Sequence, residues 1–145
     1  MPDRAHVLAV IDSAYAARET GDKEALARHF APFATFHIVG REELLGFDVG
    51  PVDAMSAIGE LIDLFTFHRM ERLHVAIDGD IAVIHWRIEA SASDGIRETT
   101  ELCDIWRFDD DAKVRSIVEF GDTALIARML IGARAKSLAV NMSGG

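Results

Sequence analysis

The feature that most constrains the fold is a change of hydrophobic periodicity near residue 69. Beyond it, four runs alternate apolar and polar residues with the period of two typical of β-strands, over 69–77, 81–90, 96–108 and 113–120. The connections between them are Asp78-Gly79, Asp94-Gly95 and Asp109-Asp110-Asp111. Because Asp-Gly pairs accept positive φ and favour tight hairpins, this half of the chain predicts an antiparallel meander.

The first half of the sequence carries helical patterns that can cover such a sheet. Residues 3–19 form one amphipathic pattern, whose apolar stripe holds Val7, Leu8, Ile11, Ala14, Tyr15 and Arg18. A short helix is expected over 22–30 and a strand over 34–39, separated by Pro32. Residues 41–51 mix charge, Gly and Pro, which predicts a long loop able to rim a pocket.

Two further helices complete the predicted order. Asp53 can cap a helix that carries Met55, Ile58, Leu61, Ile62 and Phe65, and a last helix is expected over 122–135. The order helix, helix, strand, helix, four strands, helix predicts an α+β fold in which helices cover one face of a curved antiparallel sheet and leave a cone-shaped cavity. With 145 residues we expect a single domain over 1–135 and a flexible C-terminal tail over 136–145.

Charge and composition exclude several functional classes. The chain has 15 Lys and Arg against 24 Asp and Glu, and this formal charge of -9 disfavours binding to nucleic acid or to an anionic membrane surface. The single Cys103 excludes an internal disulfide framework and suits a reducing cytoplasm, and no stretch approaches the roughly 18 apolar residues of a membrane span. These features together predict a cytoplasmic protein. No metal-ligand spacing, phosphate-binding loop, dinucleotide motif or serine elbow is present, so we expect no metal, and phosphoryl transfer, hydride transfer and serine hydrolysis have no support.

Several segments together resemble a known superfamily. They are Tyr15-Ala-Ala-Arg-Glu-Thr-Gly-Asp22, Ala25-Leu26, Phe30-Ala-Pro-Phe-Ala-Thr-Phe36, Gly79-Asp80-Ile-Ala-Val83 and Asp104-Ile-Trp-Arg-Phe108. Their order resembles the nuclear transport factor two-like superfamily over most of residues 5–130, and within it the SnoaL-like group that includes polyketide cyclases; ketosteroid isomerase is also similar. The resemblance implies a cystatin-like roll, cofactor-free acid/base chemistry on enolisable carbonyl compounds inside the cone, and a homodimer. Because the same fold also hosts binding modules, fold alone does not determine function.

Asp104 is the first candidate for a functional residue. Strand alternation places its carboxyl on one face between Leu102 and Trp106. Apolar surroundings disfavour the charged form, so we expect a raised pKa and a carboxyl able to donate a proton near neutral pH. By resemblance it matches the protonated aspartic acid of the ketosteroid isomerase oxyanion hole. The alternative is a buried carboxylate satisfied by backbone N–H groups, Arg87 or Arg107.

Tyr15 is the expected partner of Asp104. It lies one heptad after Leu8 on the buried stripe of the first helix, so its hydroxyl needs a hydrogen-bond partner inside the protein. By resemblance it corresponds to the oxyanion-hole tyrosine of ketosteroid isomerase. The alternative is a core tyrosine that donates to a main-chain carbonyl.

The general base is where the sequence departs from ketosteroid isomerase. The matching strand, 34–40, holds no carboxylate, and His37 is its only titratable group. Phe36 and Ile38 share the opposite face, so His37 points away from the cavity if that face is the core, and a surface or interface histidine is the alternative. Glu119 is the second candidate, because SnoaL-like cyclases resemble this chain in an acidic residue late in the sheet; alternation groups it with Arg115 and Ile117 without choosing a face.

The sequence therefore predicts a cofactor-free acid/base enzyme of the cyclase, isomerase or dehydratase type. Its substrate would be a small apolar carbonyl compound bound in the cone. Asp104 and Tyr15 would hold the developing oxyanion, and His37 or Glu119 would move the proton. The expected apolar wall consists of Trp86, Trp106, Leu102, Ile58 and Leu61. The alternatives are a non-catalytic small-molecule-binding module and a dimerisation module of the same fold, which need only an apolar cavity or a filled one.

Overall fold

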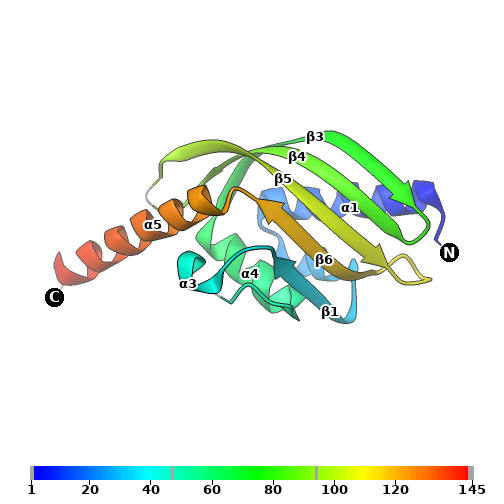
Figure 1. Cartoon of the computed structure of the whole chain (residues 1–145), viewed down its shortest axis with the longest axis horizontal. Coiled ribbons are helices and arrows are strands. Elements are labelled where there is room, and N and C mark those ends of the chain that lie inside the picture. The colour runs from blue at the N-terminus through cyan, green and yellow to red at the C-terminus, as the bar shows by residue number, and fades with distance from the viewer. Residues whose placement is uncertain (1, 47, 94, 144–145) are drawn as a thin grey trace.

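The fold is built on one curved sheet of six strands, as the computed structural model shows (Figure 1). The structure describes residues 2–46, 48–93 and 95–143. The strand order is β2-β1-β6-β5-β4-β3, with β1 Phe30–Ile38, β2 Val52–Asp53, β3 Thr66–Asp78, β4 Ile81–Ser91, β5 Arg97–Phe108 and β6 Val114–Gly121. The helices are α1 Arg4–Thr20, α2 Lys23–Ala27, α3 Glu42–Leu45, α4 Ala54–Leu64 and α5 Thr123–Ser143. The α+β class predicted from the sequence is confirmed.

The strands β3 to β6 form the predicted antiparallel meander. In the first hairpin Asp78 pairs with Ile81, so the turn residues are Gly79, with φ of +60°, and Asp80. Of the predicted Asp94-Gly95 turn, Asp94 lies outside the described residues, and Gly95 has φ of +79°. In the third connection the side chain of Asp109 accepts hydrogen bonds from the backbone N–H groups of Asp111 and Lys113. The first connection therefore turns one residue later than the predicted Asp78-Gly79 pair, and the third turns at the predicted aspartates.

The expectation of a wholly antiparallel sheet is wrong at β1. This strand runs parallel to β6, with Phe36 opposite Ile117 and His37 opposite Val118. It also begins at residue 30 rather than 34, and its register shifts between Phe30 and Thr35. Alternation within one strand indicates which face is buried but carries no information about the direction of a partner strand some 80 residues away.

Other predicted boundaries differ as well. The expected loop over 41–51 contains the short helix α3, and β2 follows it. The last helix continues to Ser143 instead of ending at Ala135, because no Gly or Pro lies between residues 133 and 143 to end it. Residues 144–145 of the expected tail lie outside the described residues, and the flexibility of 136–143 stays a prediction.

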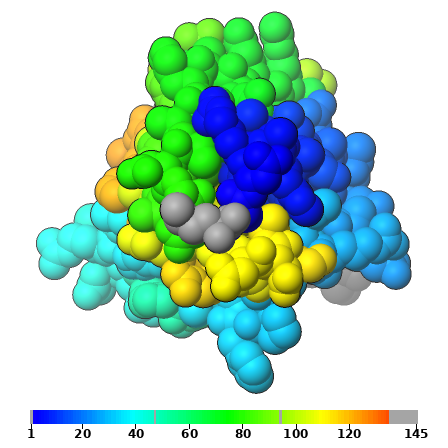
Figure 2. Space-filling model, turned by 90° about the vertical axis from the view of Figure 1, so that its right-hand side faces the viewer, coloured from blue at the N-terminus to red at the C-terminus, as the bar shows by residue number. Residues whose placement is uncertain are grey.

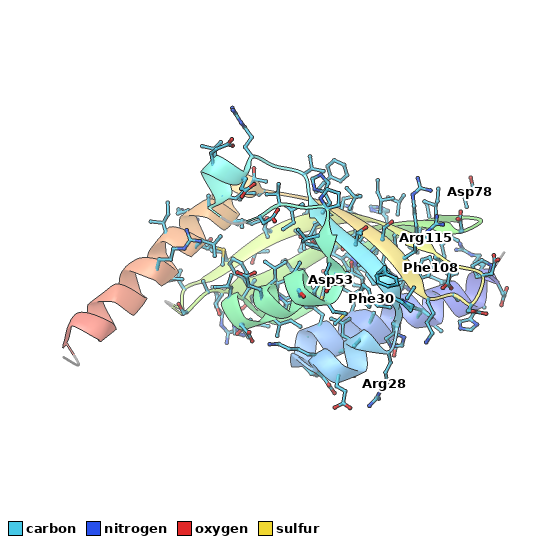
Figure 3. All side chains as sticks on the ribbon, turned by 90° about the horizontal axis from the view of Figure 1, so that it is seen from below. Arg28, Phe30, Asp53, Asp78, Phe108 and Arg115 are labelled. Atoms are coloured by element: carbon cyan, nitrogen blue, oxygen red, sulfur yellow. The ribbon has the colours of Figure 1, made fainter. Side chains whose placement is uncertain are left out.

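Helices α1 and α4 lie against the concave face of the sheet (Figure 1), and the hydrophobic core fills the space between these helices and the sheet. Asp53 caps α4 as predicted, since its side chain accepts from the backbone N–H of Ser56 at 3.0 Å. At one end Phe30 and Phe108 pack beside Trp106, with ring centroids 6.4 and 6.1 Å away (Figure 3). The largest fully buried side chains are Phe108, Ile11, Ile84, Leu130, Val7 and Val114.

Helix α1 also covers part of the edge of the sheet that β3 forms. It contacts β3, and Figure 2 shows this end of the molecule, with α1 in blue beside β3 in green and the β5–β6 region in yellow. In the part of the chain that the structure describes, no helix has both the length and the apolar character needed to cross a bilayer.

Candidate functional site

A cavity of about 100 Å³ lies between the concave face of the sheet and helices α1, α4 and α5. Most of its wall is apolar, and four of the five wall residues predicted from the sequence line it: Ile58, Leu61, Leu102 and Trp106. Trp86 does not line the cavity. It points to the same face of β4 as Ile84 and Ile88, but the Tyr15 ring lies against it with centroids 4.1 Å apart and takes its place in the wall.

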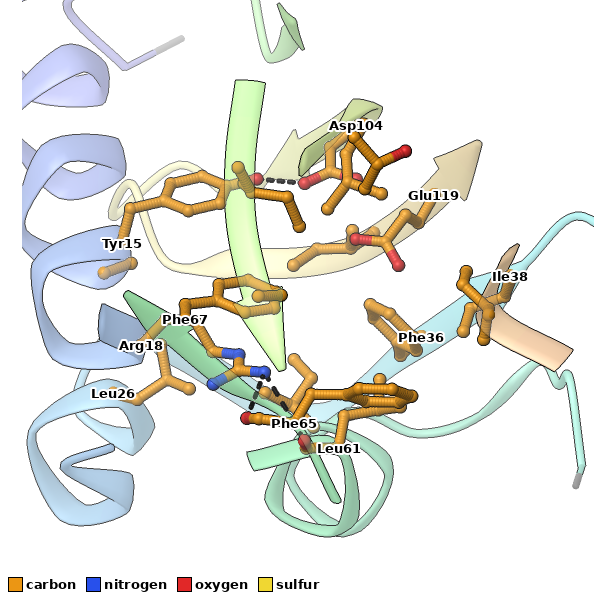
Figure 4. Close-up of a pocket in the computed structure, with 18 of the residues that line it drawn as sticks. Tyr15, Arg18, Leu26, Phe36, Ile38, Leu61, Phe65, Phe67, Asp104 and Glu119 are labelled. Carbon is orange, nitrogen blue, oxygen red and sulfur yellow. Dashed lines mark hydrogen bonds between the residues drawn. The ribbon is translucent and has the colours of Figure 1, made fainter. Parts of the chain in front are cut away.

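Polar side chains enter this apolar wall from several elements (Figure 4). Tyr15 and Arg18 come from α1, Asp104 from β5 and Glu119 from β6. Thr100 and Asp122 also line the cavity, and Asp122 caps α5 by accepting from the backbone N–H of Leu125 at 3.0 Å. The residues that meet here are therefore separated by up to about 100 positions in the sequence and are joined only by the tertiary fold.

Tyr15 and Asp104 are hydrogen-bonded to each other (Figure 4). The Tyr15 hydroxyl donates to Asp104 Oδ2, while Asp104 Oδ1 is buried and has no hydrogen-bond partner among the described residues. The Tyr15 ring is held between Trp86 and Trp106, the latter 5.2 Å away between centroids. The alternative partner expected for Tyr15, a main-chain carbonyl, is not used, and the two arginines expected as alternatives for Asp104 do not hydrogen-bond to it.

The environment of Asp104 changes its acidity. The Asp104 residue is 3% exposed, and this burial raises the pKa of its carboxyl to about 6 because a charge is poorly solvated among apolar groups. The hydrogen bond from Tyr15 acts in the opposite direction, since it stabilises the anion. Burial and the neighbouring carboxylate also raise the pKa of Tyr15, so its hydroxyl remains a donor.

Glu119 faces the cavity beside Asp104. The two residues are direct partners in the register of the antiparallel β5–β6 pair, which brings their side chains together on the concave face. Glu119 is partly accessible because it faces the cavity, yet protein surrounds it closely enough for burial to raise its pKa well above the ordinary value. The negative charge of Asp104 raises this pKa further, and Arg18 lowers it.

The surroundings of the two carboxyls favour different protonation states. Tyr15 donates to Asp104 and stabilises its carboxylate form, so the proton of the pair is favoured on Glu119 and not on Asp104, where the sequence predicts it. One cavity wall thus presents a proton acceptor and a proton donor side by side.

Arg18 is a residue of the cavity wall that the sequence did not single out as a site residue. Its Nη2 donates to the backbone carbonyls of Phe65, at 3.2 Å, and Leu61, at 3.4 Å, and its guanidinium lies 3.7 Å from the ring centroid of Phe67 (Figure 4). Burial lowers its pKa to about 10, so it stays cationic at neutral pH. The available signal was a charged residue on the otherwise apolar stripe of the first helix.

His37, the alternative base expected from the sequence, lies outside the cavity. Phe36 and Ile38 line it, and because side chains alternate along β1, His37 points to the other face. Its Nδ1 donates to the carbonyl of Val49 at 2.8 Å. Among the described residues no group of three or more His, Cys, Asp or Glu side chains is placed to hold a metal ion.

Solved structures of other proteins share this fold. A putative isomerase from Rhodopseudomonas palustris superposes with a TM-score of 0.71 at 15% identity, covering 91% of this chain and 99% of the other. A pinacolase, BvnE, from Penicillium brevicompactum gives 0.72 at 15% identity, covering 92% and 98%. An epoxide hydrolase from M. tuberculosis, described as similar to the LEH type, gives 0.66 at 12% identity, covering 98% and 99%.

The sequence comparison identifies the family. A search of curated proteins found no match to this chain. The profile of the SnoaL-like domain, in contrast, matches residues 11–126, which include Tyr15, Arg18, Asp104 and Glu119. With this match and its nuclear transport factor two-like architecture, the chain belongs to the SnoaL-like domain family.

Proposed function

We propose that this protein is a cofactor-free enzyme that transfers protons on a small apolar carbonyl compound bound in the cavity, as an isomerase, cyclase or dehydratase does. One observation carries the proposal: two carboxyls, Asp104 and Glu119, face the same apolar cavity, and their surroundings favour different protonation states. Titratable groups with separated pKa values in one cavity are typical of acid/base catalysis.

The proposed step begins with the Asp104 carboxylate. It takes a proton from the carbon next to the substrate carbonyl, while Glu119 gives its proton to the carbonyl oxygen, so that a neutral enol forms and the negative charge moves from Asp104 to Glu119. Asp104 then gives its proton to a different carbon, while Glu119 takes the proton back from the enol oxygen, which gives the isomer and restores both carboxyls. Asp104 lines the cavity, and the Tyr15 hydroxyl holds its Oδ2, so the carboxylate is fixed beside the bound substrate.

Tyr15 and the apolar wall have supporting roles in this proposal. The hydroxyl holds the Asp104 carboxylate in one orientation, and Trp86 and Trp106 hold the Tyr15 ring. Apolar neighbours such as Leu102 and Ile117 exclude water, which raises the pKa values of both carboxyls above their ordinary range.

Hydrogen–deuterium exchange tests the proposal without knowledge of the product. Enolisable ketones and aldehydes of a few carbon atoms are incubated with the protein in D₂O, and loss of the α-proton signal is followed by NMR. The wild type is expected to accelerate exchange, and Asp104→Asn and Glu119→Gln are each expected to reduce the rate by about 10²- to 10⁴-fold, the usual contribution of a positioned acid or base.

Glu101→Gln is the matched control, because Glu101 lies on the same strand as Asp104, faces the opposite side and is exposed. Its exchange rate should equal that of the wild type. Thermal stabilisation by these compounds without any exchange would contradict the proposal and favour the non-catalytic binding module instead.

A further inference from the structure

Arg18 is a buried cation that forms no direct ion pair with the described residues, although the charge of Glu119 acts on it from a greater distance. Its residue is 9% exposed, and none of the ion pairs formed by the described residues includes it. Moving a charge out of water costs several kcal/mol unless it is paired or well hydrogen-bonded, so buried arginines usually have a carboxylate beside them. The two nearest candidates in the cavity, Asp104 and Glu119, are not within ion-pair distance of it.

The donors of Arg18 are only partly used. Nη2 donates to the carbonyls of Leu61 and Phe65, whereas Nε and Nη1 donate to none of the described residues. Neither of these nitrogens is among the fully enclosed side-chain atoms that lack a partner, and the side chain lines the cavity. A guanidinium presents its donors as a planar fork that matches a carboxylate, and stacking on Phe67 keeps that plane in one orientation.

Arg18 and the carboxyl pair lie on different sides of the cavity. Figure 4 shows Arg18 beside Leu61 and Phe65 at the end of α4, while Asp104 and Glu119 project from the sheet. A molecule with a negative group at one end and its reacting carbon at the other could therefore place the negative group at Arg18 and the carbon at the carboxyl pair. A negative group near Asp104 would instead be repelled by the carboxylate there.

We propose that Arg18 binds the carboxylate of the substrate, and that the substrates are short apolar carboxylic acids carrying a carbonyl group. The reaction of these substrates rests on the proposed function. The binding of their carboxylate does not, because it depends on Arg18 alone. The cavity of about 100 Å³ is smaller than the roughly 150 Å³ engineered cavity that binds benzene, so the acid must be short.

A purely structural role for Arg18 predicts a different outcome. In that case its only task is to donate to the carbonyls of Leu61 and Phe65 at the end of α4, and the cavity makes no distinction between charged and neutral ligands. Butyrate and butyramide separate the two roles, because they have nearly the same shape and only butyrate carries a charge. Both are titrated into the full-length protein at millimolar concentration, and binding is followed by NMR chemical shifts.

Wild-type protein is expected to bind butyrate at least about tenfold more tightly than butyramide, in line with a charge-assisted hydrogen bond. Arg18→Met should abolish this preference and change butyramide binding little, and Arg18→Lys should keep part of it, since it retains the charge without the fork. Arg87→Met is the control, because Arg87 is exposed and pairs with Glu71 on the other face of the sheet. It should retain the full preference.

Equal binding of the two probes, no binding of butyrate, or an unchanged preference in Arg18→Met would overturn the proposal. If Arg18→Met fails to fold, the Nε–H signal of Arg18 in the wild type decides: it must shift with butyrate and not with butyramide. Asp104→Asn separates this proposal from the proposed function, because it should lose proton exchange while keeping the preference for butyrate. Exchange that survives in Asp104→Asn contradicts the proposed function and leaves the role of Arg18 in place.

Discussion

Replacing Tyr15 by Phe is expected to raise the pKa of Asp104. The Tyr15 hydroxyl donates the hydrogen bond that Asp104 Oδ2 accepts, and Oδ1 has no partner among the described residues, so the variant leaves the buried carboxylate much less stabilised. A hydrogen bond to a charged group contributes about 1.5–3 kcal/mol, and about 1.4 kcal/mol corresponds to one pH unit. The pKa of Asp104 should therefore rise from about 6 to about 7–8.

The measurement is clearest in a Glu119→Gln background. Glu119 and Asp104 interact, so with both present their protons are released in two steps that belong to the pair. With Gln at 119, Asp104 is the only member of the pair that titrates. The ¹³C signal of its carboxyl carbon, assigned by comparison with Asp104→Asn, is then followed against pH in this background with and without the Tyr15→Phe substitution.

The direction of the change is the decisive result. A higher pKa in the Tyr15→Phe protein supports the view that the hydroxyl donates to a carboxylate. An unchanged or lower pKa would refute it, because the hydroxyl would then be stabilising the neutral carboxyl or contributing nothing. With Glu119 present, the proposed function predicts that Tyr15→Phe shifts the acidic limb of the pH profile of proton exchange to higher pH, since Asp104 must be ionised to accept a proton.

Two further predictions concern stability. Burial raises the pKa of Asp104 from 3.8 to about 6 on folding, so folding favours its protonated form. The resulting stabilisation is complete below about pH 4 and is lost as pH rises through about 6. Over this range the free energy of unfolding should fall by about 3 kcal/mol. Urea denaturation should show that Asp104→Asn removes this part of the pH dependence, and equal pH dependence in both proteins would contradict the burial argument. Ile84→Ala, which empties a fully buried position on β4, should cost about 2–5 kcal/mol in the same assay, whereas Val83→Ala on the opposite, exposed side should cost less than about 1 kcal/mol; similar losses at both positions would show that the two faces of β4 are not distinguished as described.

The general architecture could be predicted because its signals are local. The meander of β3 to β6 follows from period-two alternation and turn residues, and α4 follows from its helical period and the Asp53 cap. The parallel pairing of β1 with β6 has no such local signal, because it depends on which distant strand is adjacent. The homodimer and the cytoplasmic location expected from the sequence stay predictions.

The site was predictable in part for the same reason. Alternation on β5 and the stripe on α1 were enough to place Asp104 and Tyr15 inside, and the resemblance indicated that they meet. The side of Glu119 was not predictable, since β6 carries apolar residues on both faces, and only its register with Asp104 determines it. For Arg18, helical periodicity gave the face of the helix but not the position of a guanidinium at the end of a long side chain.

The pairing of β1 with β6 also has a consequence for how the protein is made. Because strand 30–38 must wait for strand 114–121, the edge that pairs with β6 stays open on the ribosome until residues 114–121 have been synthesised. Contacts between such distant segments slow folding, since a large loop must close before they form. The cavity between β1 and β6 and the helices therefore forms late in folding, and a nascent chain that stops short of residue 114 lacks the strand that completes its wall.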